Sequence, residues 1–197
     1  NNEFSSEMSS NFPAKYNISP GQNSIVISLM KNNFYINQIN WGFKIPKIGK
    51  LVINARSETI NDKPLFKNLL QQNRCLIPAN SWFEWNKEKK PYLIKHRKKD
   101  IIAFAGLHRV EKNQERSFII ITAEAEKKLK QIHKRTPLVI NKENFFSWLN
   151  YDYEKAYKFL QPINSNEYTF HPVSPKVGKI SNNNISVTEK YHEKESQ

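Results

Sequence analysis

The sequence has 197 residues, which is enough for one compact domain with its own hydrophobic core. Its 31 Lys and Arg residues outnumber its 18 Asp and Glu residues, and the net charge of +13 favours a polyanionic partner such as a nucleic acid. The single cysteine, Cys75, excludes an internal disulfide and a thiolate zinc cluster, and no stretch is long and apolar enough to cross a bilayer.

The first half of the chain predicts a hairpin and a helix. Residues 23–30 and 34–41 carry strand-like patterns of apolar residues, and the Asn-rich link at 31–33 has the chemistry of a tight turn. Apolar residues at helical spacing predict a helix over 64–72, with Asp62 as its N-cap. We expect this helix to pack one face on the sheet.

The second half predicts further strands and two helical regions. Strands are expected at 74–78, 91–96, 101–107 and 117–122, a helix at 124–133 that Pro137 ends, an apolar stretch at 138–140, and a helical region at 142–160 broken near Asn150. The strands are too close together for parallel crossovers. We therefore predict a single α+β domain over 1–180, with a mostly antiparallel, barrel-like sheet flanked by several helices, and a polar, disordered tail at 181–197.

Several kinds of site are disfavoured. The 5 glycines form no Gly-rich phosphate loop, and the histidines at 96, 108, 133, 171 and 192 lack the close pairing that holds a metal ion on one helix. We expect a cytoplasmic monomer with no membrane partner, metal or other cofactor. The lysine excess could reflect a compositional bias of the source, but such a bias predicts extra Glu too, so a nucleic-acid partner is the stronger prediction.

Five short segments combine polar groups with apolar context. They are 16–21 (YNISPG), 53–59 (INARSET), 78–85 (PANSWFEW), 132–138 (IHKRTPL) and 171–174 (HPVS). In order and spacing this series resembles the SOS-response-associated peptidase (SRAP) family. The resemblance implies the SRAP fold and a protein that binds single-stranded DNA and captures abasic sites, with single-stranded DNA containing such sites as its partner.

Glu84, Asn54 and His133 are the catalytic candidates. A carboxylate between Phe83 and Trp85 would lose solvation and gain a pKa suited to proton transfer, although strand alternation equally allows an outward-facing glutamate. His133 lies at the end of a predicted helix and could be a structural cap. The resemblance implies that Glu84 is the acid/base residue, that His133 belongs to the active site, and that Asn54 orients the reacting group.

The DNA-binding candidates are basic and aromatic residues. Arg56 can clamp a phosphate, and Arg135 and His171 belong to family segments, with a structural role also open to His171. Trp41, Gly42 and Phe43 could stack on an exposed base, and Trp82 could do the same, although most tryptophans are core residues. Lys44, Lys47 and Lys50 make this loop the predicted basic edge.

The family's chemistry, as the resemblance implies it, needs a cysteine directly after the initiator methionine. Its amine condenses with the aldehyde of an abasic sugar and its thiol then closes a thiazolidine ring. The same cysteine is assigned the family's autopeptidase activity. Here no cysteine precedes Tyr16, and the family's usual first strand is missing. We expect the chain to be a fragment without its natural start, and we expect Cys75 to be a buried strand residue.

Three alternatives stay open. The chain could be a noncovalent single-stranded DNA module, a hydrolase with a Cys75–His133 dyad, or an RNA-binding domain, because basic sheets with aromatic residues bind either polymer.

Overall fold

The computed structural model describes residues 12–45, 49–111, 115–150 and 152–192. Its main sheet has eight strands, in the order β11 (Arg135–Pro137), β10 (Arg116–Glu124), β2 (Asn33–Trp41), β1 (Asn23–Met30), β6 (Arg74–Ala79), β9 (Ile102–Val110) and β12 (Val139–Ile140), with β5 (Asn54–Arg56) paired to β10. Because β9 also pairs with β10, the pairings close into a ring. Only the pairings of β10 with β2 and β5 are parallel within this sheet, so the predicted single α+β domain with a mostly antiparallel sheet is confirmed.

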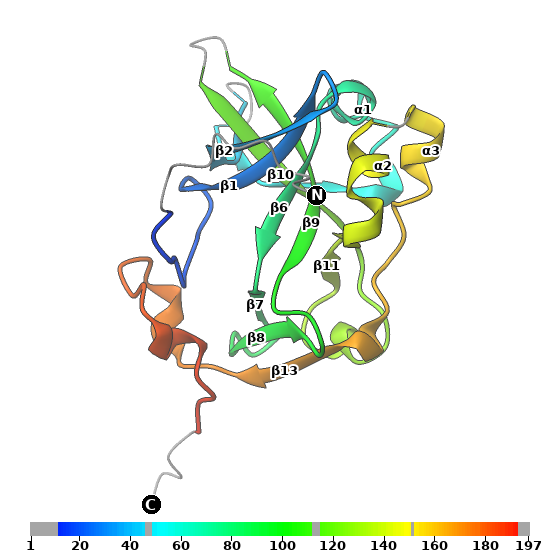
Figure 1. Cartoon of the computed structure of the whole chain (residues 1–197). Helices are drawn as coiled ribbons and strands as arrows, with labels where there is room; N and C mark the ends of the chain where they lie inside the picture. Colours follow the sequence, from blue (N-terminus) through cyan, green and yellow to red (C-terminus); the bar gives the residue numbers. More distant parts are fainter. Residues whose placement is uncertain (1–11, 46–48, 112–114, 151, 193–197) are drawn as a thin grey trace, which may run out of the picture.

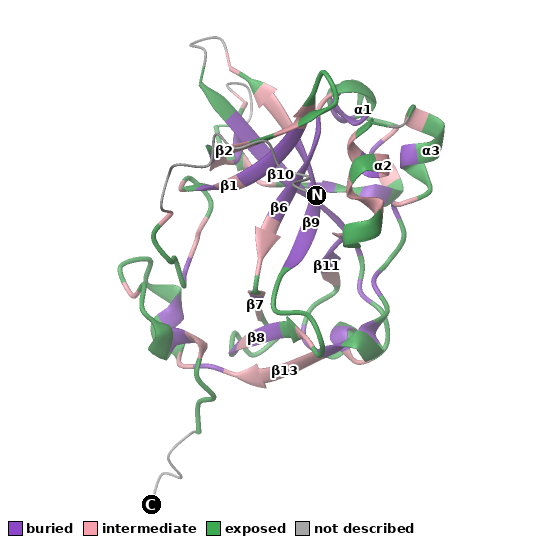
Figure 2. Ribbon diagram, in the orientation of Figure 1, coloured by how far each residue is buried: buried purple, intermediate pink, exposed green. Residues whose placement is uncertain are grey.

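Both faces of the central strands are buried, which explains their continuous apolar runs. In β10, Ile119 and Ile121 pack into the core cluster that includes Trp148 of α2 (Phe145–Asn150). Phe118 and Ile120 of the same strand point to a second cluster with Trp82. Figure 2 shows this buried centre in the ribbons of the main sheet. The sheet therefore separates a core under the helices from a core on the other side.

Three α-helices lie together on one side of the main sheet (Figure 1): α1 (Pro64–Gln72), α2 and α3 (Tyr153–Tyr157). The prediction of Asp62 as the N-cap of α1 is wrong, because Lys63 holds that position and makes no side-chain cap bond. The predicted helix at 124–133 is also wrong. Glu124 still belongs to β10, the backbone at Lys127 is left-handed (φ 41°), and only a short 3-10 turn, η2 (Leu129–Gln131), follows. Pro137 lies in β11.

A second, smaller sheet covers the other core. Its order is β13 (Tyr168–Pro172), β8 (Pro91–His96) and β7 (Ser81–Trp85), and a short pair joins β3 (Phe43–Lys44) to β4 (Leu51–Val52). The remaining elements are short 3-10 turns: η1 (Ser57–Thr59), η3 (Lys142–Asn144), η4 (Ser165–Glu167), η5 (Pro175–Gly178) and η6 (Ile185–Thr188). No helix within the described ranges is long and apolar enough to cross a membrane.

The prediction of a disordered tail does not hold for residues 181–192. Val187 of η6 is buried against Leu93 and Val173. The buried Asn17 side chain donates to the carbonyls of Val177 (2.8 Å) and Asn182 (3.2 Å). In Figure 1 the first described residues and this C-terminal segment lie side by side at the lower left. The apolar and amide contacts of a few residues thus order a segment whose composition is polar; residues 193–197 lie outside the described residues.

Candidate functional site

A cavity of about 1120 Å³ lies between the main sheet, the small sheet and the first described residues. All five sequence segments contribute to its lining, through residues 16–20, residues 53–54, residues 78–85, Pro137 and His171. Segments that are far apart in sequence are therefore brought to one place. The segment 132–138 also reaches the cavity through the contact between His133 and Glu84.

Glu84 lies in β7 and lines this cavity. Its side chain is half-buried, and burial raises the pKa of its carboxyl group to about 8. At neutral pH the group therefore holds its proton and can donate it. Carboxyl groups with such shifts gather at functional sites.

His133 meets Glu84, although it does not lie at a helix end. It occupies the loop between η2 and β11, so no helix dipole favours its charged form. Its Nδ1 lies 3.4 Å from Oε2 of Glu84, 3.1 Å from the carbonyl oxygen of Arg135 and 3.3 Å from the amide nitrogen of Arg135. Nδ1 can accept the amide proton when it is bare, and can donate to the carboxylate or the carbonyl when protonated. The proton on Nδ1 thus decides which partner it binds.

Asn54 and Arg56 point to the same side of β5, because Ala55 between them is buried in the core. The parallel pairing of β5 with β10 places Asn54 opposite Ile120, and Asn54 is exposed on the cavity wall. Arg56 is exposed next to it on the strand. Both side chains therefore lie on the face of β5 that points away from the core, and Asn54 lines the cavity.

Arg135 and His171 already have protein partners. Two nitrogens of the Arg135 guanidinium donate to the two carboxylate oxygens of Glu58, at 3.0 and 2.9 Å, and one of them also contacts Thr122. Nε2 of His171 lies 3.0 Å from the Thr188 carbonyl oxygen. These bonds hold both side chains in structural roles in the free protein, which the predicted DNA contacts would have to share.

The predicted base-stacking residues divide by burial. Phe43 is 0% exposed and lies under the guanidinium of Arg109, so its prediction as a stacking residue is wrong. Gly42 is buried with φ 121°, and an added Cβ would meet Leu51 at 3.3 Å. Trp41 lines the cavity, but its ring stacks on Phe118 and its Nε1 donates to the Ile53 carbonyl oxygen.

Trp82 is a core residue, whereas Trp85 on the same strand, β7, is exposed. The Trp82 ring packs edge-on against Phe104 and Tyr168 and is 8% exposed, so base stacking by Trp82 is not supported. Trp85 is 41% exposed and lines the cavity. Trp85 is not among the predicted stacking residues, although its place beside Glu84 was a usable signal.

The basic edge of the cavity also differs from the predicted one. Lys44 and Lys50 are exposed but line no part of this cavity, and Lys47 lies outside the described residues. The basic residues on the cavity lining are Lys15, Lys95, Arg97, Lys98 and Lys99. Four of them come from the end of β8 and the turn after it.

Cys75 is fully buried in β6, and burial raises the pKa of its thiol, so it is neither exposed nor ionised at neutral pH. This confirms the prediction of a buried strand cysteine and argues against a Cys75–His133 dyad. No group of three metal-ligating side chains occurs in the part of the chain that the structure describes.

Comparisons with known proteins show the family and the fold of this chain. The family model "SOS response associated peptidase (SRAP)" matches residues 1–180. The chain is 34% identical over 192 residues to the abasic site processing protein YoqW of Bacillus subtilis, covering 89% of this chain and 86% of that protein. It is 31% identical over 179 residues to the abasic site processing protein YedK of Escherichia coli, covering 85% and 81%. A solved structure from Bacteroides thetaiotaomicron shares the fold, with a TM-score of 0.76 at 22% identity, over 87% of this chain and 82% of that chain.

Proposed function

Because the chain belongs to the SOS response associated peptidase (SRAP) family, we propose that it processes abasic sites in single-stranded DNA. The observation that carries this proposal is the pair of Glu84 and His133, 3.4 Å apart, beside a cavity on which the family segments converge. The names of its relatives supply the substrate class, and the cavity supplies a place where one extruded sugar could be held.

The surroundings of the cavity suit a single strand of DNA. Lysine and arginine side chains on its lining can neutralise phosphates, and the exposed ring of Trp85 can stack on a neighbouring base. Asn54 offers an amide that can orient the sugar from the opposite wall. These phosphate, base and sugar contacts would bind DNA whether or not a covalent bond forms.

The covalent form of the proposal uses a cysteine at the amino terminus. Its amine attacks the aldehyde of the ring-opened sugar, and the neutral carboxyl group of Glu84 supplies a proton to the departing hydroxyl group, which leaves as water. The nitrogen then returns one proton to the Glu84 carboxylate, which leaves the neutral imine. The thiol then adds to the imine carbon, and its proton moves to the nitrogen, which closes the thiazolidine. Cys75 cannot perform this reaction, because it is buried and its nitrogen is part of the backbone.

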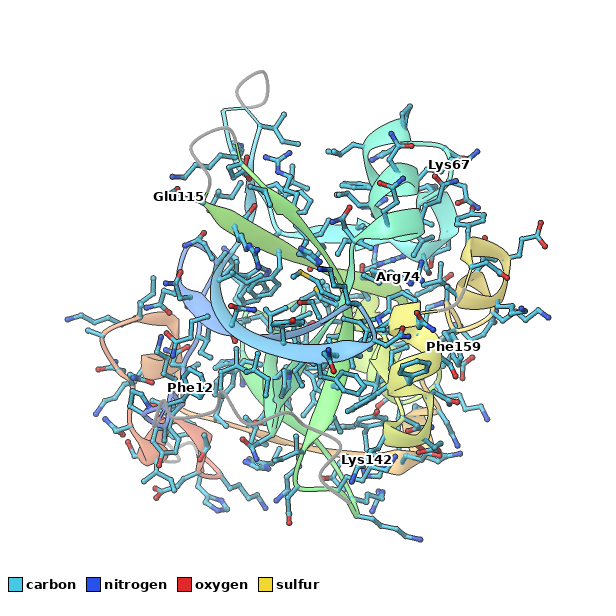
Figure 3. All side chains as sticks on the ribbon, turned by 45° about the horizontal axis from the view of Figure 1, so that its top comes forward. Phe12, Lys67, Arg74, Glu115, Lys142 and Phe159 are labelled. Carbon is cyan, nitrogen blue, oxygen red and sulfur yellow. The ribbon has the colours of Figure 1, made fainter. Side chains whose placement is uncertain are left out.

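The described part of the chain begins beside the cavity. Phe12, labelled in Figure 3, is the first described residue and lines the cavity.

Equilibrium binding tests the noncovalent part. Fluorescence anisotropy of the chain with a single-stranded oligonucleotide carrying one abasic site is compared with the intact oligonucleotide and with RNA of the same sequence. We expect the abasic strand to bind most tightly and all binding to weaken steeply with salt. Equal affinity for abasic and intact strands would reduce the function to a noncovalent single-strand module, and a preference for RNA would contradict the proposal.

A further inference from the structure

Glu58 follows β5 in the turn η1 and forms the other half of the Arg135 ion pair. Its Oε1 accepts from Nη1 of Arg135 at 3.0 Å and from the backbone amide of Glu124 at 2.8 Å, and its Oε2 accepts from Nη2 of Arg135 at 2.9 Å. Burial alone would raise the pKa of Glu58, but the bonds and charge of Arg135, with backbone bonds, hold that pKa below its ordinary value. The Glu58 carboxylate is therefore ionised, and it binds the planar guanidinium of Arg135 through two hydrogen bonds.

The backbone of Arg135 lies next to the imidazole of His133. Both the amide and the carbonyl of Arg135 lie within 3.3 Å of Nδ1 of His133. The same arginine also contacts the hydroxyl and carbonyl of Thr122, so its side chain adds to the backbone pairing that holds the start of β11 to β10. The His133 side chain is 43% exposed and lies in a loop. Its place beside Glu84 thus depends on where Arg135 is held.

We propose that Glu58 is a positioning residue that, by clamping Arg135, holds the imidazole of His133 next to the carboxyl group of Glu84. The inference rests on the proposed function for its purpose, but its geometry exists in the free protein. It gives Arg135 a role other than the predicted DNA contact. It also joins two sequence segments, 53–59 and 132–138, through one ion pair.

Nuclear magnetic resonance of the free, isotope-labelled protein tests this arrangement without DNA. Glu58→Gln removes the charge and one acceptor, and Arg135→Lys keeps the charge but loses the fork. Glu124→Gln is the matched control, because the Glu124 carboxylate pairs with Lys130 at 2.7 Å and only its backbone amide touches Glu58. The His133 signals are assigned with a His133→Ala variant.

We expect Glu58→Gln and Arg135→Lys each to move the imidazole signals of His133, while Glu124→Gln leaves them unchanged. The double variant should move them no further than either single one, because both changes break the same fork. If Glu58→Gln does not fold, Arg135→Lys decides. Unchanged His133 signals in the folded variants, or an equal change in Glu124→Gln, would overturn the proposal.

A reaction arm separates this inference from the proposed function. In a version of the chain that begins Met-Cys, we expect Glu58→Gln to slow crosslinking to abasic DNA about 100-fold through displacement of the catalytic pair, with Glu124→Gln unaffected. If the parent version forms no crosslink, the covalent function fails, and the resonance data still decide the role of Glu58.

Discussion

The raised pKa of Glu84 makes the stability of the protein depend on pH in a defined direction. The pKa rises from its ordinary 4.5 to about 8 in the folded state. Between these values the folded state holds a proton that the unfolded state has lost, so the free energy of unfolding falls as the pH rises through this window. The shift corresponds to about 5 kcal/mol at 1.4 kcal/mol per unit. This is an upper limit, because water in the open cavity and a protonated His133 both stabilise the carboxylate.

Glu84→Gln removes this titration and keeps a similar shape. We expect the variant and the parent to be similarly stable near pH 4, and the variant to gain up to about 5 kcal/mol over the parent by pH 9. Urea unfolding of both proteins at intervals across this range measures the difference, in which the titrations of all other groups largely cancel. A difference that stays flat from pH 4 to 9, or one that grows in favour of the parent, would refute the reasoning.

Three further changes test packing and the cavity. Gly106→Ala places a Cβ 2.3 Å from Cδ1 of Ile77 and 2.9 Å from the Ile119 carbonyl oxygen, and we expect a loss of about 1–3 kcal/mol by urea unfolding; a loss under about 0.5 kcal/mol would contradict the packing. Asn17→Ala leaves the carbonyls of Val177 and Asn182 without this donor, and we expect it to lower the free energy of unfolding by about 1–3 kcal/mol and to speed proteolysis near residue 182. Unchanged stability would argue against a stabilising role for these hydrogen bonds. Trp85→Ala should weaken binding of single-stranded DNA by about 1–3 kcal/mol in anisotropy measurements while leaving the unfolding temperature unchanged, and unaltered affinity would remove Trp85 from the site.

Elements whose signals are local were predictable from the sequence. The strands at 23–30 and 34–41 form as β1 and β2, joined by a turn with left-handed residues Lys31 (φ 48°) and Asn32 (φ 63°). The helix at 64–72 and the break near Asn150 also agree with the structure. In each case the apolar spacing and the turn residues lie within the element that they define.

Features that depend on distant partners were not predictable in this way. The apolar spacing of Leu129 and Ile132 fits a helix, but the two residues lie in and beside a short turn and are buried there. A longer helix does not form, because the pairing of β10 with β11 holds the two ends of the segment together. Phe43 follows an aromatic residue and a glycine, yet it belongs to the core.

The candidate site shows the same division. The resemblance selected Asn54, Glu84 and His133, and the structure places Asn54 and Glu84 on one cavity with His133 in contact with Glu84. Glu58 and Arg135 form an ion pair although they are 77 positions apart in the sequence, so no local sequence pattern predicts this contact. The exposure of Trp85 beside the buried Trp82 likewise depends on the neighbouring sheet.

A denaturing gel distinguishes covalent capture of an abasic site from noncovalent binding. Two versions of the chain, beginning Met-Cys and Met-Ser, are incubated with single-stranded DNA that carries one abasic site and with the intact strand. We expect a denaturant-stable, shifted band only for Met-Cys with the abasic strand, and we expect Glu84→Gln to weaken this band. No such band, or an equal band for Met-Ser or for the intact strand, would contradict covalent capture through the terminal cysteine.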